Sequence, residues 1–204
     1  MILSEQIAAD LLHIKAVFLS PNEPFTWASG IKSPIYCDNR LTLSDVAVRE
    51  DVENGLAETI KQYYSETEML MGTSTAGIAH AAITATKLNL PMGYVRSGAK
   101  DHGRQNQIEG KLLPGQKVVV VEDLISTAGS CLEVVEVLRE AGAEVLGIVS
   151  IFTYGMKKGL NRLAEAKVVN HSLSNLDVLA EVAVKEGYIS AKEKVELIQF
   201  RDNL

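Results

Sequence analysis

The sequence predicts an α/β fold in which a central, mostly parallel sheet is flanked by helices. From residue 68 onward, short apolar runs alternate with stretches of helical spacing, which is typical of strands joined by crossover helices. One of these runs, residues 118–121, consists of four valines, as expected for a strand buried on both faces. The 204 residues are 47% hydrophobic and 23% charged, which is the size and balance of one compact domain.

The N-terminal part of the chain opens with a helix that we expect over residues 4–19. Its apolar side chains recur every three or four residues, and Ser4 stands where an N-cap is preferred. These apolar positions are Ile7, Leu11, Ile14 and Phe18. A second amphipathic stretch, residues 44–64, predicts a longer helix.

A segment rich in proline and glycine separates these two helices. It holds two short β-like pieces, at residues 25–27 and 35–37, with Gly30 and Pro34 between them. We therefore expect an irregular, hairpin-like segment here.

In the α/β part, the expected strands alternate with expected helices. The strands are expected at residues 69–71, 92–96, 117–121, 145–152 and 167–170. The helices are expected at residues 76–88, 129–141 and 157–165. Ser174 with Asp177, and Ser190 with Glu193, resemble helix starts, so we expect two further helices near the C-terminus.

Composition excludes several classes of function. A net charge of -6 argues against general nucleic-acid binding. Cys37 and Cys131 show no CxxC spacing, so we expect reduced thiols rather than a disulfide framework or a zinc site. No stretch approaches the roughly 18 apolar residues of a membrane helix, and the N-terminus lacks the pattern of a signal peptide. We therefore expect a soluble, cytoplasmic protein that binds neither nucleic acid nor membrane.

The strongest functional signal follows the four-valine strand. Glu122 and Asp123 stand at its carboxyl end, and the small and hydroxyl residues 126–130 lead into the next helix. Ligands of open α/β sheets bind at the carboxyl ends of strands, and a helix start offers free N–H groups to a phosphate. Neither GxxxxGK[ST] nor GxGxxG is present, so the segment is neither a P-loop nor a dinucleotide fingerprint. An ordinary strand, turn and helix is the alternative.

This segment resembles the phosphoribosyl pyrophosphate (PRPP) motif of type I phosphoribosyltransferases, and the resemblance implies that family's fold. It also implies that residues 126–130 wrap the 5-phosphate of PRPP and that Glu122 and Asp123 address the ribose hydroxyls. Asp123 would further stabilise positive charge at the anomeric carbon. The PRPP-binding residues implied in this segment are Glu122, Asp123, Leu124, Ile125, Ser126, Thr127, Ala128, Gly129 and Ser130.

A polar, glycine-containing loop at residues 97–110 carries the second signal. Cations on a loop can neutralise the charge that grows on departing pyrophosphate. The loop and the strand before it resemble the catalytic loop of orotate phosphoribosyltransferases, although Ser97 replaces a lysine of many members. The resemblance implies that Arg96, Lys100 and His102 bind PRPP and act in catalysis. It also implies a homodimer with active sites shared between subunits; a solvated surface loop is the alternative.

Residues 24–40 resemble the N-terminal signature of the same family, where such a segment helps to cover the base. The resemblance implies a single domain over residues 1–204, with a hood formed largely by residues 1–40 and part of the C-terminal region. Its activity would be transfer of ribose 5-phosphate from PRPP to orotate, giving orotidine 5-monophosphate in pyrimidine (UMP) biosynthesis. Mg2+ would be the cofactor, bound mainly through PRPP rather than by protein ligands.

The acceptor side of the site is less well defined by the sequence. Orotate is an anion and needs cations or convergent donors, so Lys32 and Arg40 are candidates, together with Ser126. Other family members carry lysines where this chain has Ala28 and Ala76, the latter in a second glycine loop at residues 72–81 that resembles the family's pyrophosphate loop. For Trp27, Tyr36 and Tyr154, core packing is as good an interpretation as ligand contact.

Two rival functions stay open at this point. One is a phosphoribosyltransferase that acts on a purine or another pyrimidine, which the SPIY segment at residues 33–36 disfavours. The other is a regulator with the same fold that senses PRPP and binds nucleic acid, which the net charge of -6 disfavours.

Overall fold

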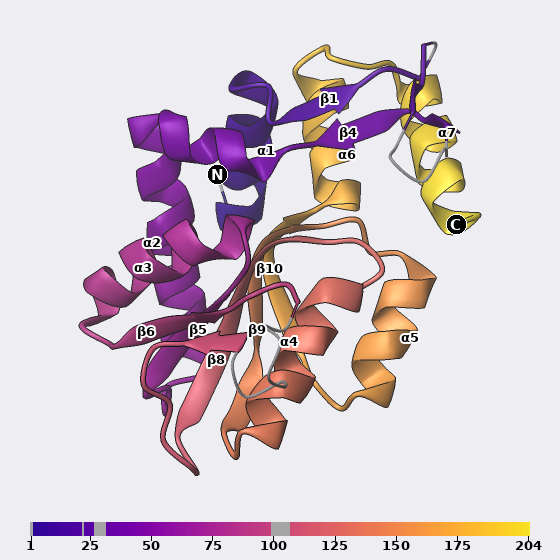
Figure 1. The fold of residues 1–204 in the computed structure, drawn as a ribbon. Coiled ribbons are helices and arrows are strands. Elements are labelled where there is room, and N and C mark those ends of the chain that lie inside the picture. Colours follow the sequence, from indigo (N-terminus) through magenta and orange to yellow (C-terminus); the bar gives the residue numbers. More distant parts are fainter. Residues whose placement is uncertain (1, 22, 27–31, 99–106) are drawn as a thin grey trace.

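The computed structural model describes residues 2–21, 23–26, 32–98 and 107–204. At its centre lies a six-stranded sheet with the order β10-β9-β8-β5-β6-β7 (Figure 1). Its neighbouring strands run parallel except for β7, which is antiparallel to β6. The strands are β5 (Met69–Thr73), β6 (Met92–Val95), β7 (Ile108–Glu109), β8 (Lys117–Ile125), β9 (Glu144–Thr153) and β10 (Asn170–Asn175).

The four valines of β8 show how the sheet is covered on both faces. Val118 and Val120 pack in one hydrophobic cluster with α4 (Gly129–Glu140) and α5 (Lys157–Glu165). Val119 and Val121 pack in the other cluster, with α2 (Val46–Tyr63) and α3 (Ala76–Leu88). All four side chains are completely buried, because successive residues of a strand face opposite sides of a sheet. The expected mostly parallel sheet between helices is therefore confirmed.

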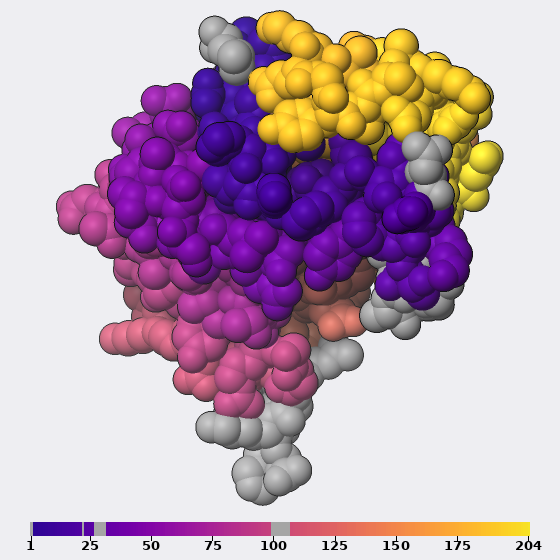
Figure 2. All heavy atoms as spheres, turned by 90° about the horizontal axis from the view of Figure 1, so that it is seen from above, coloured from indigo at the N-terminus to yellow at the C-terminus, as the bar shows by residue number. Residues whose placement is uncertain are grey.

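An upper layer lies over the carboxyl ends of the strands and is built from both ends of the chain. Its elements are α1 (Leu3–His13), β1 (Val17–Leu19), β2 (Phe25–Thr26), β3 (Lys32–Ser33), β4 (Ile35–Cys37), the 3-10 helix η1 (Asn39–Ser44), α6 (Leu176–Lys185) and α7 (Ala191–Asp202). Seen from above, the N-terminal and C-terminal residues adjoin (Figure 2). A hydrogen bond of 2.8 Å from the Ser174 hydroxyl to the Ser4 carbonyl joins the two ends.

The first helix is shorter than the predicted 4–19. It ends at His13, since Lys15 adopts a left-handed backbone conformation with φ 58° that no helix continues. Residues 17–19 instead form β1, which pairs antiparallel with β4. Phe18, expected on the buried helix face, is 40% exposed. The preference of β-branched Val17 for strands, together with pairing to β4, favours an extended conformation here in spite of the helical spacing.

The last strand was also placed wrongly, at 167–170. It spans Asn170–Asn175 and pairs in parallel with β9, although its polar sequence shows no apolar alternation. The helix that follows is capped by Asn175, whose side chain accepts from Val178 N, and not by Ser174. The capping box of Ser190 and Glu193 is confirmed, as are the helices expected at 76–88 and 157–165.

The described residues form neither a membrane-spanning helix nor a cluster of metal ligands. None of the helices they form is both long and apolar enough to cross a membrane. Nor do they gather three or more histidine, cysteine or acidic side chains where a metal ion could be held.

Candidate active site

The candidate site lies where the direction of the chain's crossovers changes. Strands β5 and β8 are neighbours in the sheet, yet β5 continues through α3 to β6 on one side and β8 continues through α4 to β9 on the other. Such a switch point opens a crevice outside the carboxyl ends of the two strands, and this is where ligands of open α/β sheets bind. Two loops border it. We call residues 74–75, after β5, the first loop, and residues 126–128, after β8, the phosphate loop.

Two glycines allow helices to start directly against these strands and loops. A Cβ added at Gly77 would lie 2.3 Å from the Val121 carbonyl oxygen and 2.5 Å from the Thr73 hydroxyl. A Cβ added at Gly159 would lie 2.4 Å from the carbonyl oxygen of Ser126. Only glycine permits these approaches. The starts of α3 and α5 therefore hold the crevice from two sides.

Glu122 and Asp123 lie within β8 rather than after it, because the strand runs to Ile125 and not to the predicted residue 121. Successive positions of a strand alternate across the sheet, yet the two carboxyl groups remain in contact, since a hydrogen bond between them is among the causes that raise the pKa of Glu122. Glu122 is only 5% exposed. Its Oε1 accepts from the Thr73 hydroxyl at 2.6 Å and from Asp123 N at 3.0 Å, and its Oε2 accepts from the Ser130 hydroxyl at 3.3 Å. Burial, with the adjacent Asp123 carboxyl, raises the pKa of Glu122 to about 8.

Asp123 is half-buried, and its charge acts on Cys37 and Arg40 of the upper layer. Its carbonyl oxygen accepts a 2.7 Å hydrogen bond from Nδ2 of Asn39, which is fully buried in η1. Cys37 of β4 lies close by: burial raises the pKa of its thiol well above the ordinary value, and the charge of Asp123 adds to the effect. The Asp123 carboxylate is thus the acidic group of this pair that is directed toward the space between sheet and upper layer.

The phosphate loop ends in a helix start with unused donors. Ala128 precedes α4 in a left-handed conformation with φ 59°, and no side chain caps the helix. First-turn N–H groups left without a side-chain acceptor suit an anion, and the helix dipole adds to the attraction. Arg162 of α5 braces the loop from outside by donating from Nη1 to the Thr127 carbonyl at 3.2 Å.

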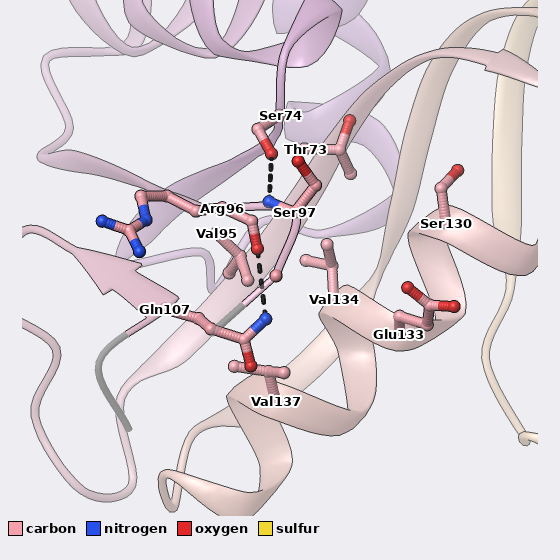
Figure 3. A pocket seen from close by; sticks show the side chains of 11 residues that line it. Thr73, Ser74, Val95, Arg96, Ser97, Gln107, Ser130, Glu133, Val134 and Val137 are labelled. Carbon is pink, nitrogen blue, oxygen red and sulfur yellow. Dashed lines mark hydrogen bonds between the residues drawn. The ribbon is translucent and has the colours of Figure 1, made fainter. Parts of the chain in front are cut away.

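A pocket lies beside the first loop, between the end of β6 and α4 (Figure 3). Ser97 N donates to the Ser74 hydroxyl at 2.7 Å, and Gln107 Nε2 donates to the Arg96 carbonyl at 3.2 Å. The Arg96 side chain makes a 3.3 Å ion pair with Glu109 and points away from Ser130 in Figure 3. The pocket is lined by Thr73, Ser74, Val95, Arg96, Ser97, Gly98, Gln107, Ser130, Glu133, Val134 and Val137.

The remaining predicted loop residues, Lys100 and His102, lie outside the described residues, as does Trp27. Their predicted roles therefore stay predictions. Arg96 stands at the root of the loop, immediately after β6, and the next residue, Ser97, donates its N–H to the Ser74 hydroxyl of the first loop.

The two cations considered for orotate lie in the upper layer and are engaged differently. Lys32 is exposed and donates to the Thr26 hydroxyl at 2.7 Å. Arg40 makes a bidentate contact to Asp38, with distances of 2.6 Å and 2.8 Å, and this carboxylate raises the pKa of the guanidinium. Among the described residues, no hydrogen bond joins either cation to residues 122–130.

Of the aromatic candidates, Tyr154 belongs to the core and Tyr36 to the surface. Tyr154 is 4% exposed and packs edge-to-face against Phe152. Tyr36 is 42% exposed and lies in an aromatic row in which Phe25 contacts both Tyr36 and Phe18. Core packing is therefore the correct interpretation for Tyr154.

Thr73 and Asn39 lie in the segments 72–81 and 24–40, which resemble motifs of the family, but neither was predicted individually as a site residue. Thr73 ends β5 at the switch point, and the rule that ligands bind at carboxyl ends of strands could have identified it. Asn39 has no such signal, because its contact spans 84 residues of sequence.

Comparison with known proteins agrees with this geometry. Residues 46–184 match the family model described as a phosphoribosyl transferase domain. An orotate phosphoribosyltransferase of Bacillus mycoides is 58% identical over 201 residues, covering 98% of this chain and 96% of that protein. One of Listeria innocua is 57% identical over 203 residues, covering 100% and 97%. The crystal structure of orotate phosphoribosyltransferase from Aeropyrum pernix matches with a TM-score of 0.77 at 31% identity, over 90% of this chain and 99% of that one. The chain belongs to the phosphoribosyltransferase family, within its orotate phosphoribosyltransferase group.

Proposed function

We propose that the protein transfers ribose 5-phosphate from PRPP to orotate, releasing pyrophosphate and forming orotidine 5-monophosphate for UMP synthesis. The observation that carries the proposal is the switch point between β5 and β8, where an acidic pair and an uncapped helix start meet. It occurs in a chain 58% identical to an orotate phosphoribosyltransferase over nearly its whole length.

The donor would occupy the segment from Glu122 to Ser130. The 5-phosphate would accept hydrogen bonds from the N–H groups of the phosphate loop and of the first turn of α4, with hydroxyls of Ser126 and Thr127 nearby. Asp123, half-buried and facing the upper layer, would meet the ribose hydroxyls. Its negative charge would also stabilise the cationic character that develops at the anomeric carbon.

The pyrophosphate would leave toward the first loop and the cations that follow β6. Arg96, Lys100 and His102 would stabilise its growing charge. We further propose a homodimer in which this loop serves the neighbouring subunit's site, as the family resemblance implies. A cytoplasmic location agrees with the two free cysteines, Cys37 and Cys131.

The acceptor would lie beneath the upper layer, which we propose to act as the hood of a single domain over residues 1–204. Lys32 is the better candidate for the orotate carboxylate, because within the described part of the chain its ammonium group contacts a neutral hydroxyl, whereas Arg40 is already paired with Asp38. Ser126 would add a donor from the phosphate loop.

Magnesium fits this site as an ion held mainly by the donor. Mg2+ prefers to keep several water ligands, so it would bind mainly through water and the oxygens of PRPP. When bound, Mg2+ supplies charge neutralisation for the pyrophosphate oxygens. The carboxylate of Asp123 would lie near the ribose hydroxyls of PRPP.

The reaction requires no nucleophilic side chain. The bond between C1 and pyrophosphate breaks as the orotate ring nitrogen forms its bond to C1. The protein would contribute position, exclusion of water and fixed charges on both sides of the reacting carbon.

The fall of orotate absorbance on mixing protein, PRPP and Mg2+ tests the proposal, with purine bases and magnesium-free samples as controls. We expect rapid, magnesium-dependent loss of orotate. Lys100→Ala should lower kcat by roughly 10²-fold or more, the scale for losing one charge stabiliser, whereas Lys111→Ala, at an exposed position, should not. Turnover of a purine in place of orotate would refute the assigned acceptor.

A further inference from the structure

One buried carboxylate joins the two loops of the site. Glu122 accepts hydrogen bonds from Thr73, which ends β5 just before the first loop, and from Ser130, in the first turn of α4 just after the phosphate loop. A third donor is the backbone N–H of Asp123. The two side-chain donors come from segments that lie 49 and 8 residues away from Glu122 in sequence.

We propose that Thr73 and Glu122 are positioning residues that hold the first loop and the phosphate loop at the separation PRPP requires. The inference rests on the proposed function, because it concerns the same donor. It adds a role for Thr73, and it gives Glu122 a task within the protein in addition to any contact with ribose.

Burial makes this contact strong and specific. Thr73 is 2% exposed and Glu122 is 5% exposed, so water does not compete for their hydrogen bond of 2.6 Å. The Thr73 hydroxyl also lies 3.3 Å from the Val121 carbonyl, but the shorter contact to the carboxylate takes its single proton. Gly77 packs against the same hydroxyl, which fixes its position further.

The connection continues beyond the two residues toward the loop that follows β6. Ser74, next to Thr73, donates its N–H to the Val95 carbonyl at 3.2 Å and accepts from Ser97 N at 2.7 Å. A continuous path of contacts thus runs from Ser130 through Glu122 and Thr73 to the residues beside Arg96. PRPP would bridge the two ends of this path, with its 5-phosphate at one and its pyrophosphate at the other. A change in their separation would weaken both contacts at once.

Equilibrium binding of PRPP, measured by calorimetry with Mg2+ and without any base, tests the inference. Thr73→Val keeps the shape of the side chain and removes the hydroxyl. We expect its Kd for PRPP to rise up to about 10-fold, the order expected for losing one buried hydrogen bond. Thr73→Ser keeps the hydroxyl and should restore most of the affinity.

Thr59→Val is the matched control. Thr59 is also buried, at 9% exposure, and its hydroxyl donates to a backbone carbonyl, that of Gly55 at 2.8 Å. It lies in α2, away from both loops, so its loss should affect stability and leave the Kd for PRPP within about 2-fold, inside the scatter of surface and structural effects. If Thr73→Val does not fold, Thr73→Ala replaces it.

Kinetics separate positioning from a general loss of structure. The KM for PRPP should rise in Thr73→Val while the KM for orotate stays near that of the wild type. Equal PRPP affinity in Thr73→Val and wild type, or a Thr73→Ser variant as weak as Thr73→Val, would overturn the inference. A wild type that binds PRPP but consumes no orotate would overturn the assigned acceptor alone, and a wild type that does not bind PRPP would overturn both.

Discussion

The two sides of the candidate site are built in different ways. On the side proposed to bind PRPP, which we call the donor side, β5 and β8 carry the loops, and the strands are fully buried at Leu70, Met71 and Val118 to Val121. On the acceptor side, β1 pairs with β4 over three residues and β2 pairs with β3 over two. There, Phe18 and Tyr36 are 40% and 42% exposed. The donor side therefore inherits its rigidity from the core, whereas the acceptor side depends on short strands at the surface.

This difference has a physical consequence for each substrate. A hairpin of two strands is marginally stable alone, and needs packing from other elements. By our proposal, buried hydrogen bonds such as those at Glu122 would fix the loops before PRPP binds. We therefore expect substitutions on the donor side to affect rate and PRPP binding strongly. Substitutions on the acceptor side should affect orotate binding more mildly.

The largest effect is expected for Asp123→Asn. It removes the charge opposite the reacting carbon and preserves shape, so kcat should fall roughly 10²-fold or more. Steady-state kinetics at saturating PRPP and orotate measure it. Asp51→Asn, an exposed carboxylate of α2, is the control and should leave kcat near wild type. A kcat within a few-fold of wild type for Asp123→Asn would show that the donor side does not supply the charge we assign to it.

An intermediate effect is expected on the acceptor side. Lys32→Ala should raise the KM for orotate about 10-fold, the order for one hydrogen bond to a charged group, with little change in the KM for PRPP. Arg40→Ala should act less strongly, because its guanidinium already contacts Asp38. Thr26→Val, which removes the neutral partner of Lys32, serves as control. A larger rise in the KM for PRPP than in the KM for orotate in Lys32→Ala would contradict the contrast between the two sides.

The smallest effect concerns stability and pH. The pKa of Glu122 rises from its ordinary 4.5 to about 8, mainly through burial. Between these values the folded protein retains a proton that the unfolded chain releases, so this group's contribution to stability is present below pH 4.5 and is lost as the pH rises toward 8. The Glu122→Gln side chain cannot ionise, so this variant does not lose that stability as the pH rises. The Tm of Glu122→Gln should therefore increase relative to the Tm of the wild type as the pH rises.

Thermal unfolding at several pH values across that window measures the difference. Glu58→Gln, which changes an exposed carboxylate of α2, should follow the wild-type curve. Parallel curves for wild type and Glu122→Gln would mean that Glu122 ionises in the folded protein much as it does in water, and that the donor side is less buried in solution.

Local patterns predicted much of the α/β part. The helices at 76–88 and 157–165 match because their apolar spacing and end signals lie within each segment. The polar strand β10 was misplaced because its pairing with β9, not its own sequence, makes it a strand. The first helix was overextended for a related reason: residues 17–19 fit a helical spacing but pair with β4.

The sequence by itself determined the strand of buried valines, the acidic pair and the hydroxyl-rich loop before α4, because each consists of consecutive residues. Only the tertiary structure decided what these residues do to one another. Glu122 meets Thr73 across 49 residues, and Asp123 meets Asn39 across 84. The Glu122 side chain accepts from Thr73 and Ser130, whereas Asp123 accepts from Asn39 through its backbone carbonyl, so two adjacent residues of one motif acquire different partners. Which partners they meet depends on the strand order β8-β5 and on the layer folded above it, and no local pattern records either.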